Sequence, residues 1–500
     1  MDMRMANYYR TTSNKKIGAI LSKAVIFILA IYTLYLICLN IKAIKYNIVV
    51  FAKYTLLILS VFVIIYFVAN HINKSPVVFA MVIFVLSVVA KSMLIFLTDT
   101  KPVSDFEIFY QYSIELVNGN TAFGDSLYFK TWAYQTGPVI YYAAIMKLFG
   151  TGLLPLKIVN CFFMAATNVL IYLIARKISN ENSARAVSLL YLFYPAPYFL
   201  TTVLTNQHFA AGMFLLAIYI FLSERLNWAI KGIIAGVVIA FGNAVRPIGI
   251  IIIVASIIWG IIEIIRTHKY FKMCSIITLL ISYLLVNYGC SAVVKYTGIN
   301  SEGLVNNFPL WKFVVGLNYE AKGQFSYEDE NNIYKIKDFD ERNNVAKQVI
   351  KQRLSIGARQ LAGLMNEKQK TMWAGTDTIS WGFYKEIDGQ LVASKEVKKF
   401  EAIILKLEKI YYVLIYILML LGICKLLTDD EISQAISLLS LILLCYFGVH
   451  FLIEIQVRYR YFAVIIVFIM AAKGSEMLFS RCGAYRKNIR KVNYGNLIIK

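Results

Sequence analysis

Charged residues are scarce in this chain of 500 residues. Only 16% are Asp, Glu, Lys or Arg, whereas 59% are hydrophobic and the mean hydropathy is +0.62. A soluble protein could not bury that much apolar surface, so the composition argues against a soluble fold. It predicts an all-α polytopic membrane protein, with Phe and Tyr supplying most of the interfacial anchoring because there are only six Trp.

The chain also lacks a cysteine pattern that would indicate disulfides or a metal site. Its seven cysteines are scattered, mostly inside apolar runs, and none lies in the polar segment 296–400. We therefore predict no disulfide framework, no metal and no cofactor. The net charge of +22 lies mainly in short loops and the tail, where topology and lipid phosphate explain it better than nucleic acid does.

Long apolar runs are what the sequence has in abundance. A hydrocarbon core of ~30 Å needs about 20 apolar residues per helix. The runs predict about twelve spans, at 17–39, 48–69, 77–98, 155–176, 185–204, 208–223, 228–245, 248–265, 272–294, 402–427, 432–452 and 461–479. The first run lacks a persuasive cleavage site, which indicates an uncleaved span.

Basic residues predict the orientation of these spans. Arg4, Arg10, Lys15 and Lys16 precede the first span, and several more follow the last, so both termini are expected in the cytoplasm of a cell-membrane protein. Lys42 and Lys45 are the exception, because this scheme places them outside.

This topology divides the chain into five parts. They are 1–76, with two extra spans; a membrane core at 77–294, with an outer loop at 99–154; an extracytoplasmic domain at 295–401; the last membrane helices at 402–479; and a basic cytoplasmic tail at 480–500. The apolar run 138–149 is too short to span and predicts an interfacial helix.

A carboxylate pair opens the first outer loop. In Ser104-Asp105-Phe106-Glu107, an acidic side chain before helix-compatible sequence is typical of a helix N-cap. The alternative is catalytic, because a half-buried carboxylate can accept the proton of an attacking hydroxyl. The residues themselves leave both interpretations open.

Three further clusters face the same side in this topology. Lys130 and Tyr134 lie in an aromatic stretch that suits either sugar and phosphate binding or an interfacial belt. His208, in the turn 205–208, could be a ligand, although a lone histidine is more often a polar cap. The fourth cluster consists of Arg246, Glu454, Arg458, Tyr459 and Arg460. Arginines at an outer membrane face suit phosphate binding, or else structural Arg–Glu bridges.

The order of these features resembles the C superfamily of integral-membrane glycosyltransferases, in the branch of protein O-mannosyltransferases and aminoarabinose transferases. The residues that carry the resemblance are Asp105-Phe106-Glu107, Gly137-Pro138, Leu148-Phe149-Gly150, Arg176-Lys177, Pro195, Asn206-Gln207-His208, Arg246-Pro247 and Glu454-Ile455-Gln456-Val457-Arg458-Tyr459. Segments 315–320 and 370–375 are similar to those of Gram-positive bacterial members. The resemblance covers roughly residues 77–480, so the first two spans lie outside it.

The resemblance implies an inverting transfer of a sugar from a polyprenyl-phosphate carrier at the extracytoplasmic face. It implies that Asp105 is the catalytic base, that Glu107 supports it or contacts the acceptor, and that Arg246, Arg458 and Lys130 hold the donor phosphate. We expect the remaining substrate contacts from Tyr134, Asn206, Gln207, His208, Glu454 and Tyr459. Many relatives carry adjacent acidic residues where this chain has Asp-Phe-Glu, and several carry an acidic residue near the turn 205–208. These differences leave open the role of Glu107 and the identity of any second acid.

The acceptor stays open among a cell-envelope glycan, a lipid and a protein side chain. Two other functions are compatible with the composition: a flippase of lipid-linked sugars, and a polymerase of surface polysaccharides. Transporters tend to show internal repeats and charges at mid-membrane depth, and here the apolar runs hold few charges, Lys91 and Lys147 among them. That contrast favours the enzyme.

Overall fold

The computed structural model describes residues 2–388 and 390–495, and these are almost entirely helical. Ten of the described helices are long and apolar enough to cross a membrane. They are α1 (Asp2–Lys42), α2 (Ile48–His71), α3 (Pro76–Leu97), α7 (Leu153–Ile178), α11 (Trp228–Val245), α12 (Gly249–Thr267), α13 (Lys272–Tyr296), α19 (Lys395–Thr428), α20 (Gln434–Leu452) and α21 (Tyr461–Gly495). The predicted fold class, an all-α multi-pass membrane protein, is confirmed.

Ordinary capping explains where several of these helices begin. The side chains of Ser75, Asn227 and Ser433 accept hydrogen bonds from backbone N–H groups in the first turns of α3, α11 and α20. Pro76 follows Ser75 at the start of α3, where its missing N–H costs nothing. These signals agree with the apolar runs, so the predicted boundaries of these spans differ from the observed ones by at most two residues.

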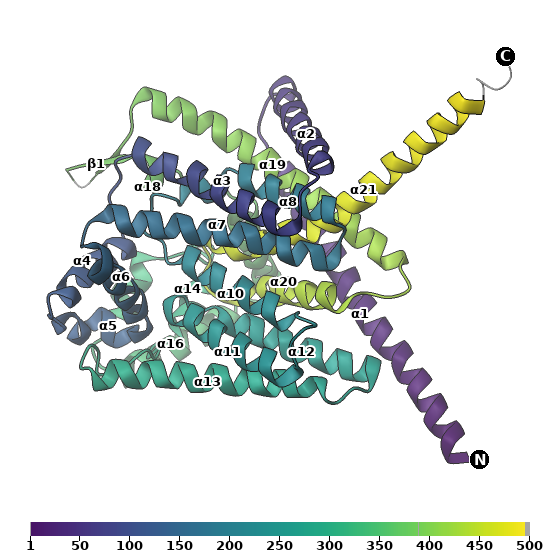
Figure 1. Ribbon diagram of the computed structural model, residues 1–500. Helices are drawn as coiled ribbons and strands as arrows, with labels where there is room; N and C mark the ends of the chain where they lie inside the picture. The colour runs from purple at the N-terminus through teal and green to yellow at the C-terminus, as the bar shows by residue number, and fades with distance from the viewer. Residues whose placement is uncertain (1, 389, 496–500) are drawn as a thin grey trace.

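The long helices lie side by side as a bundle (Figure 1). The first part of α1 and the last part of α21 leave the bundle at the same end, and the short helices α4 (Asp105–Val117), α5 (Leu127–Thr131) and α6 (Thr136–Phe149) lie at the opposite end. Which end faces the cytoplasm stays a prediction. The side chains of the basic tail 480–500, and those of Arg4 and Arg10, lie outside the described residues.

Two of the twelve predicted spans are wrong as full-length helices. The run 185–204 contains α8 (Glu181–Phe193, 13 residues) and the single turn α9 (Ala196–Phe199), and the run 208–223 contains α10 (Gln207–Phe221, 15 residues). The helix ends before Pro195, because proline donates no backbone hydrogen bond and disfavours helix in the preceding residue.

The broken stretch between α9 and α10 is enclosed by protein. Thr201, Thr202 and Thr205 are buried, and the hydroxyl of Thr202 donates to Gly382 O at 2.7 Å. Tyr142 donates to Leu204 O. Irregular backbone is tolerated at membrane depth only where protein or a polar cavity satisfies it. This break brings Asn206 to the end of the bundle.

The outer loop 99–154 packs closely on the bundle end. Helix α6, at the place of the predicted interfacial helix, has 14 residues and is too short to span. Gly137 lies against the end of α11 so closely that a Cβ atom there would be 1.7 Å from Ala244 O. This contact sets the one-turn helix η2 (Ala133–Gln135) beside Arg246, which directly follows α11.

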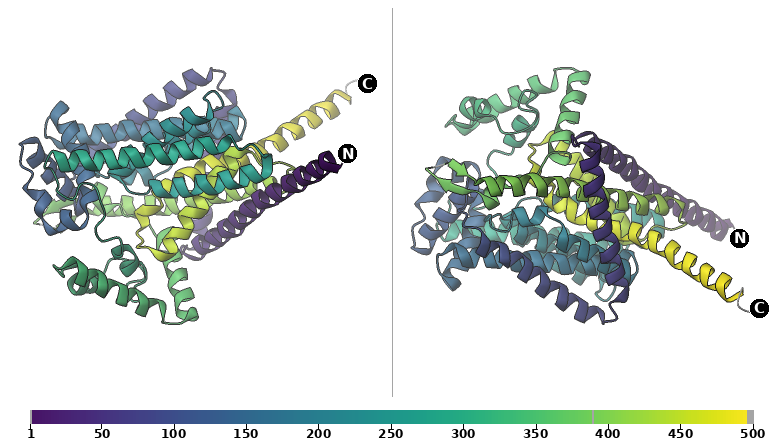
Figure 2. Two further views of the ribbon diagram at one scale, coloured as in Figure 1. Left: turned by 90° about the horizontal axis from the view of Figure 1, so that it is seen from below. Right: turned by 90° about the horizontal axis from the view of Figure 1, so that it is seen from above.

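The segment between α13 and α19 projects from the bundle as a group of short helices (Figure 2). It contains α14 (Trp311–Gly316), α15 (Tyr327–Asp329), η3 (Glu330–Tyr334), α16 (Phe339–Leu354), α17 (Ala358–Trp373), α18 (Ser380–Phe383) and the antiparallel pair β1 (Lys385–Ile387) and β2 (Gln390–Val392), in which Glu386 faces Leu391. A small apolar core of its own, around Phe308, Trp311 and Val314, orders it.

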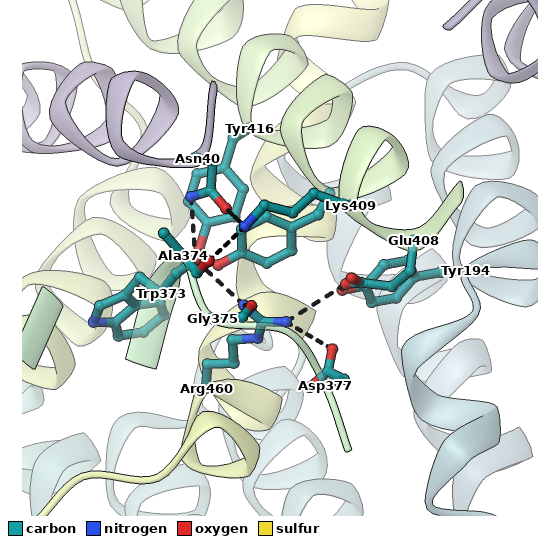
Figure 3. A network of polar contacts seen from close by, with 11 residues as sticks. Asn40, Tyr194, Trp373, Ala374, Gly375, Asp377, Glu408, Lys409, Tyr416 and Arg460 are labelled. Carbon is teal, nitrogen blue, oxygen red and sulfur yellow. Dashed lines mark hydrogen bonds and ion pairs between the residues drawn. The ribbon is translucent and has the colours of Figure 1, made fainter. Parts of the chain in front are cut away.

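A buried polar network ties this segment to the bundle (Figure 3). Arg460, the last residue of η4 (Val457–Arg460), donates to Trp373 O and Gly375 O at 3.2 Å each. Its guanidinium also pairs with Asp377 at 2.6 Å and Glu408 at 3.6 Å. The network therefore fixes the chain after α17 against the start of α21.

The same network reaches the N-terminal helix. Lys409 of α19 donates to Asn40 Oδ1 at 2.6 Å and to Ala374 O at 2.7 Å (Figure 3). Asn40, near the end of α1, donates in turn to Trp373 O at 3.1 Å. Helix α1, which lies outside the range of the family resemblance, is therefore built into the bundle.

Candidate active site

A cavity of about 580 Å³ lies at the bundle end where the outer loop packs. We call it the inner cavity, because membrane helices α11, α13 and α20 supply much of its wall. Polar side chains from four places face it: Asp105 from the start of α4, Asn206 from the broken stretch, Arg246 from the end of α11, and Glu454 and Arg458 from the turn between α20 and α21. Apolar residues, among them Ile248 and Leu284, complete the lining.

A second cavity of about 670 Å³ adjoins the first, and we call it the outer cavity. Loop and segment residues surround it, including Trp132, Trp311, Tyr327 and Trp381. Seven residues line both cavities and form the boundary between them: Asp105, Tyr134, Gln135, Lys312, Glu454, Arg458 and Tyr459. A reactant in either cavity can therefore reach the same set of charged groups.

Asp105 is aimed at this boundary by an unusual turn. The preceding residue, Ser104, has φ 56° and ψ −138° and makes no side-chain cap, so Asp105 is the first residue of α4 and not its N-cap. A non-glycine residue in such a conformation costs about 1–3 kcal/mol, and such strain tends to be kept at functional sites. The helix start favours the negative charge of the carboxylate.

One side chain contacts the Asp105 carboxylate directly. Tyr128 donates its hydroxyl hydrogen to Asp105 Oδ1 at 3.3 Å. Burial, and then the negative charge of Asp105, raise the pKa of Tyr128 well above its ordinary value, so the phenol keeps its proton and acts as a donor. Oδ2 makes no hydrogen bond or ion pair with the described residues and stays available to a substrate.

Two arginines at the cavities have no carboxylate partner among the described side chains. Arg246 donates to Asn206 Oδ1 at 3.1 Å and lies 5.2 Å from the centroid of the Tyr459 ring. Arg458 donates to Gln456 Oε1 at 2.6 Å and lies over the rings of Phe106 and Trp381. Burial lowers the pKa of Arg246, so an anion in the inner cavity would stabilise its charged form.

The one ion pair at the boundary joins Lys312 to Glu454 at 2.5 Å. Burial alone would raise the pKa of Glu454, but the charge and hydrogen bond of Lys312, with Gln456 and Arg458, bring it below its usual value. Both groups are therefore charged at neutral pH. With the two arginines and Asp105, the boundary and inner wall carry three positive charges and two negative ones, a balance that suits one phosphate.

A buried lysine holds the turn that carries Glu454. Lys368 of α17 donates to Gly316 O, Phe451 O and Ile453 O at 2.7–2.9 Å. The backbone adds two contacts, because Glu454 N donates to Lys312 O at 2.8 Å and Ile455 N donates to Gly323 O at 2.9 Å. The projecting segment thus positions the Lys312–Glu454 pair.

Part of the sequence matches a known protein family. The family model described as dolichyl-phosphate-mannose-protein mannosyltransferase matches residues 136–290, from the start of α6 into α13. In this range, about a third of the chain, the protein is similar to that mannosyltransferase family. The matched range includes the broken stretch, Asn206 and Arg246.

Two solved structures are also similar to this chain. The apo oligosaccharyltransferase of Archaeoglobus fulgidus has 13% identity and a TM-score of 0.42, and the match covers 83% of this chain and 52% of that one. The chain therefore spans about half the length of that enzyme. ArnT from Cupriavidus metallidurans, solved with undecaprenyl phosphate, has 12% identity and a TM-score of 0.30, with 80% and 77% covered. No curated protein matches the chain.

The structure brings together seven of the eleven site residues expected from the sequence. Asp105, Tyr134, Asn206, Arg246, Glu454, Arg458 and Tyr459 line the inner cavity. The alternative of Arg–Glu bridges within the fourth cluster is not found in the described part of the chain for Arg246 and Arg458, because Glu454 pairs with Lys312 instead.

The other four expected residues lie elsewhere. Glu107 is exposed and Lys130 pairs with Asp125 at 3.2 Å, and neither lines either cavity. Gln207 is buried behind Arg246. His208 bonds Tyr461 and Leu200 O through its two ring nitrogens, so it ties α10 to α21 in place of binding substrate.

The residues expected from the sequence do not include Lys312, which lines both cavities, or Trp381, which lines the outer one. Tyr128 and Gln135, which also line a cavity, lie in the same aromatic stretch as Lys130 and Tyr134. Lys312 stands between Trp311 and Phe313, within the segment 295–401 that the sequence predicts to be an extracytoplasmic domain. A cation flanked by two aromatics in an outer segment was the available signal.

Proposed function

We propose that this protein is a glycosyltransferase that moves a sugar from a polyprenyl-phosphate donor to a hydroxyl group of a cell-envelope acceptor, with inversion, at the extracytoplasmic face. One observation carries the proposal. A carboxylate with a free oxygen, Asp105, shares a cavity with two arginines that have no carboxylate partners. This is the combination that base-assisted displacement of a phosphate requires.

The inner cavity suits the donor. Its lining includes Leu284 and Tyr288, which are 55% and 78% exposed on the outer surface of the bundle, so the cavity extends to where lipid chains lie. An apolar chain can therefore enter from the side of α13 while its phosphate reaches Arg246 and Arg458. Guanidinium groups bind phosphate oxygens in a bidentate manner and stay charged when partly buried.

The reaction requires one proton transfer and one displacement. Asp105 accepts the proton of the acceptor hydroxyl, whose oxygen forms a bond to the anomeric carbon. The bond from that carbon to the phosphate oxygen breaks, and the lipid phosphate leaves with the electron pair. Because the oxygen attacks opposite the leaving phosphate, the configuration inverts. Arg246 and Arg458 stabilise the charge on the departing phosphate.

The test compares Asp105→Asn with Glu107→Gln in proteoliposomes containing radiolabelled polyprenyl-phosphate sugars and a cell-wall extract. Loss of a general base lowers rates by about 10²–10⁴-fold, so transfer by Asp105→Asn should fall by that factor while the protein stays folded. Glu107→Gln removes a charge two residues away that lines neither cavity, and it should keep its activity. Full transfer by Asp105→Asn would refute the assigned role.

A further inference from the structure

We propose that the outer cavity is the acceptor site and that it takes an uncharged glycan, not a polyanionic polymer, a lipid or a peptide. This proposal rests on the proposed function, because it names the acceptor for the same reaction. The cavity adjoins the donor cavity along the boundary that contains Asp105. An acceptor in it would place a hydroxyl beside the free oxygen of that carboxylate.

Fixed aromatic rings form one side of the outer cavity. Trp132 stacks on Tyr334 with ring centroids 4.6 Å apart and lies 6.2 Å from Trp311. Tyr128 meets the edge of Trp132 at 5.3 Å. Because these rings hold one another, they offer a rigid apolar surface of the kind that packs against the C–H faces of a sugar ring.

Two exposed aromatic rings also line the outer cavity. Phe325 and Tyr327 line the outer cavity, yet they are 46% and 76% exposed and lie edge to face at 5.2 Å. They belong to the projecting segment and to none of the apolar clusters among the described residues. Apolar surface left in water at the rim of a cavity suggests that a partner covers it.

The charges of the outer cavity argue against a polyanion. Ten residues line it and not the inner cavity: Ser104, Tyr128, Trp132, Trp311, Gln324, Phe325, Tyr327, Glu330, Trp381 and Gln456. Glu330 is the one charged residue in this described set, so a polyol-phosphate chain would meet a carboxylate and no cation outside the boundary. By contrast, Arg246 faces the inner cavity.

The polar groups that remain suit hydroxyls. Gln324 offers an amide donor and an acceptor, and Ser104 and Glu330 add acceptors. Gln456 already accepts from Arg458 and donates to Glu454, so it offers only its second N–H and second lone pair. A peptide could bind as an added strand, but β1 and β2, the two strands in the described residues, line neither cavity. A lipid acceptor would need the opening between apolar helices that belongs to the inner cavity.

The experiment uses the full chain in proteoliposomes and the double variant Phe325→Ala/Tyr327→Ala, with Tyr319→Ala as the control. Tyr319 is 46% exposed in the same segment and lines neither cavity. The acceptors are neutral hexose and N-acetylhexosamine oligosaccharides, poly(glycerol phosphate), a Ser/Thr peptide and a glycolipid. Donor KM, acceptor KM and acceptor-independent hydrolysis of the donor are measured for each protein, and oligosaccharide binding is followed by tryptophan fluorescence.

We expect a neutral oligosaccharide to be the best acceptor. Loss of the two rings should raise its KM and its dissociation constant on the order of tenfold, with donor KM, hydrolysis and the Tyr319→Ala protein unchanged. An unchanged acceptor KM in the double variant, or preference for the polyanion, peptide or glycolipid, would overturn the proposal while leaving the proposed function intact. If donor cleavage does not depend on Asp105, the proposed function fails. In that case the binding measurement still tests the acceptor site. The acceptor site is overturned if the oligosaccharide does not bind, or if it binds the wild type and the double variant equally.

Discussion

Replacing Arg246 distinguishes the contribution of this cavity cation to catalysis from its contribution to stability. Its guanidinium has one polar partner among the described side chains, Asn206 Oδ1 at 3.1 Å, and no carboxylate. Loss of one such hydrogen bond costs about 1 kcal/mol. The Arg246→Met protein should therefore fold, with a decrease in unfolding temperature of only a few degrees.

The effect on catalysis is expected to be larger. A guanidinium and a departing phosphate about 4 Å apart interact by about 4 kcal/mol at an effective dielectric constant of about 20. Since about 1.4 kcal/mol corresponds to a tenfold change in rate, Arg246→Met should lose on the order of 10³-fold in kcat. Arg246→Lys keeps the charge but not the bidentate geometry, so its kcat should lie between those of the wild type and Arg246→Met.

The assay measures sugar release from the polyprenyl-phosphate donor in proteoliposomes at saturating donor, alongside thermal unfolding in detergent. Arg359→Met is the matched control, because that arginine is exposed on α17 and lines neither cavity. Activity of Arg246→Met within threefold of wild type would refute its role in holding the leaving phosphate. A protein that loses activity only because it unfolds would equally contradict the structural reasoning.

Two further substitutions test charged groups, one in the buried polar network and one at the boundary. Arg460→Met leaves the buried Glu408 and the half-buried Asp377 without their cation and should lower the free energy of unfolding by about 3–5 kcal/mol, seen as a large drop in unfolding temperature. In wild type the pKa of Glu454 is lowered, so its contribution to stability is present above the unfolded pKa of about 4.3 and is lost as pH falls through the lower folded value. Lys312→Met removes the opposing cation while burial remains, so the pKa of Glu454 should rise. The acid limb of the pH profile of kcat/KM should then move to higher pH. An unmoved limb would contradict the prediction that Lys312 keeps Glu454 ionised at the active site.

The membrane helices were the part of this fold that sequence could predict. Spans such as 228–245 follow from apolar runs with capping residues at their starts, both of which are local properties. The run 185–204 has the same composition but contains Pro195, and hydropathy does not register that the helix ends there. Its irregular backbone survives because distant residues enclose it, Gly382 among them, and a linear sequence does not show that proximity.

The site was predictable to the extent that its residues carry unusual charges for their positions. Asp105, Arg246 and Arg458 stand out because ionisable groups next to apolar runs are unfavourable unless they bind something. Lys130 met the same criterion and was misleading, because its pairing with Asp125 depends on the fold of a short turn. Lys312 was hidden for the opposite reason, since its importance comes from Glu454, 142 residues away.

The bond between Asn40 and Lys409 has a consequence for how this protein is made. The two residues are 369 positions apart in the chain. At a translation rate of about 5–20 residues per second, roughly 20–70 s pass between the synthesis of α1 and that of its partner in α19. During that time the first helix resides in the membrane with a polar amide that its final neighbour cannot yet satisfy. Completion of the bundle is therefore a late step of biogenesis, and a truncated nascent chain would leave the bond between α1 and the rest of the structure unmade.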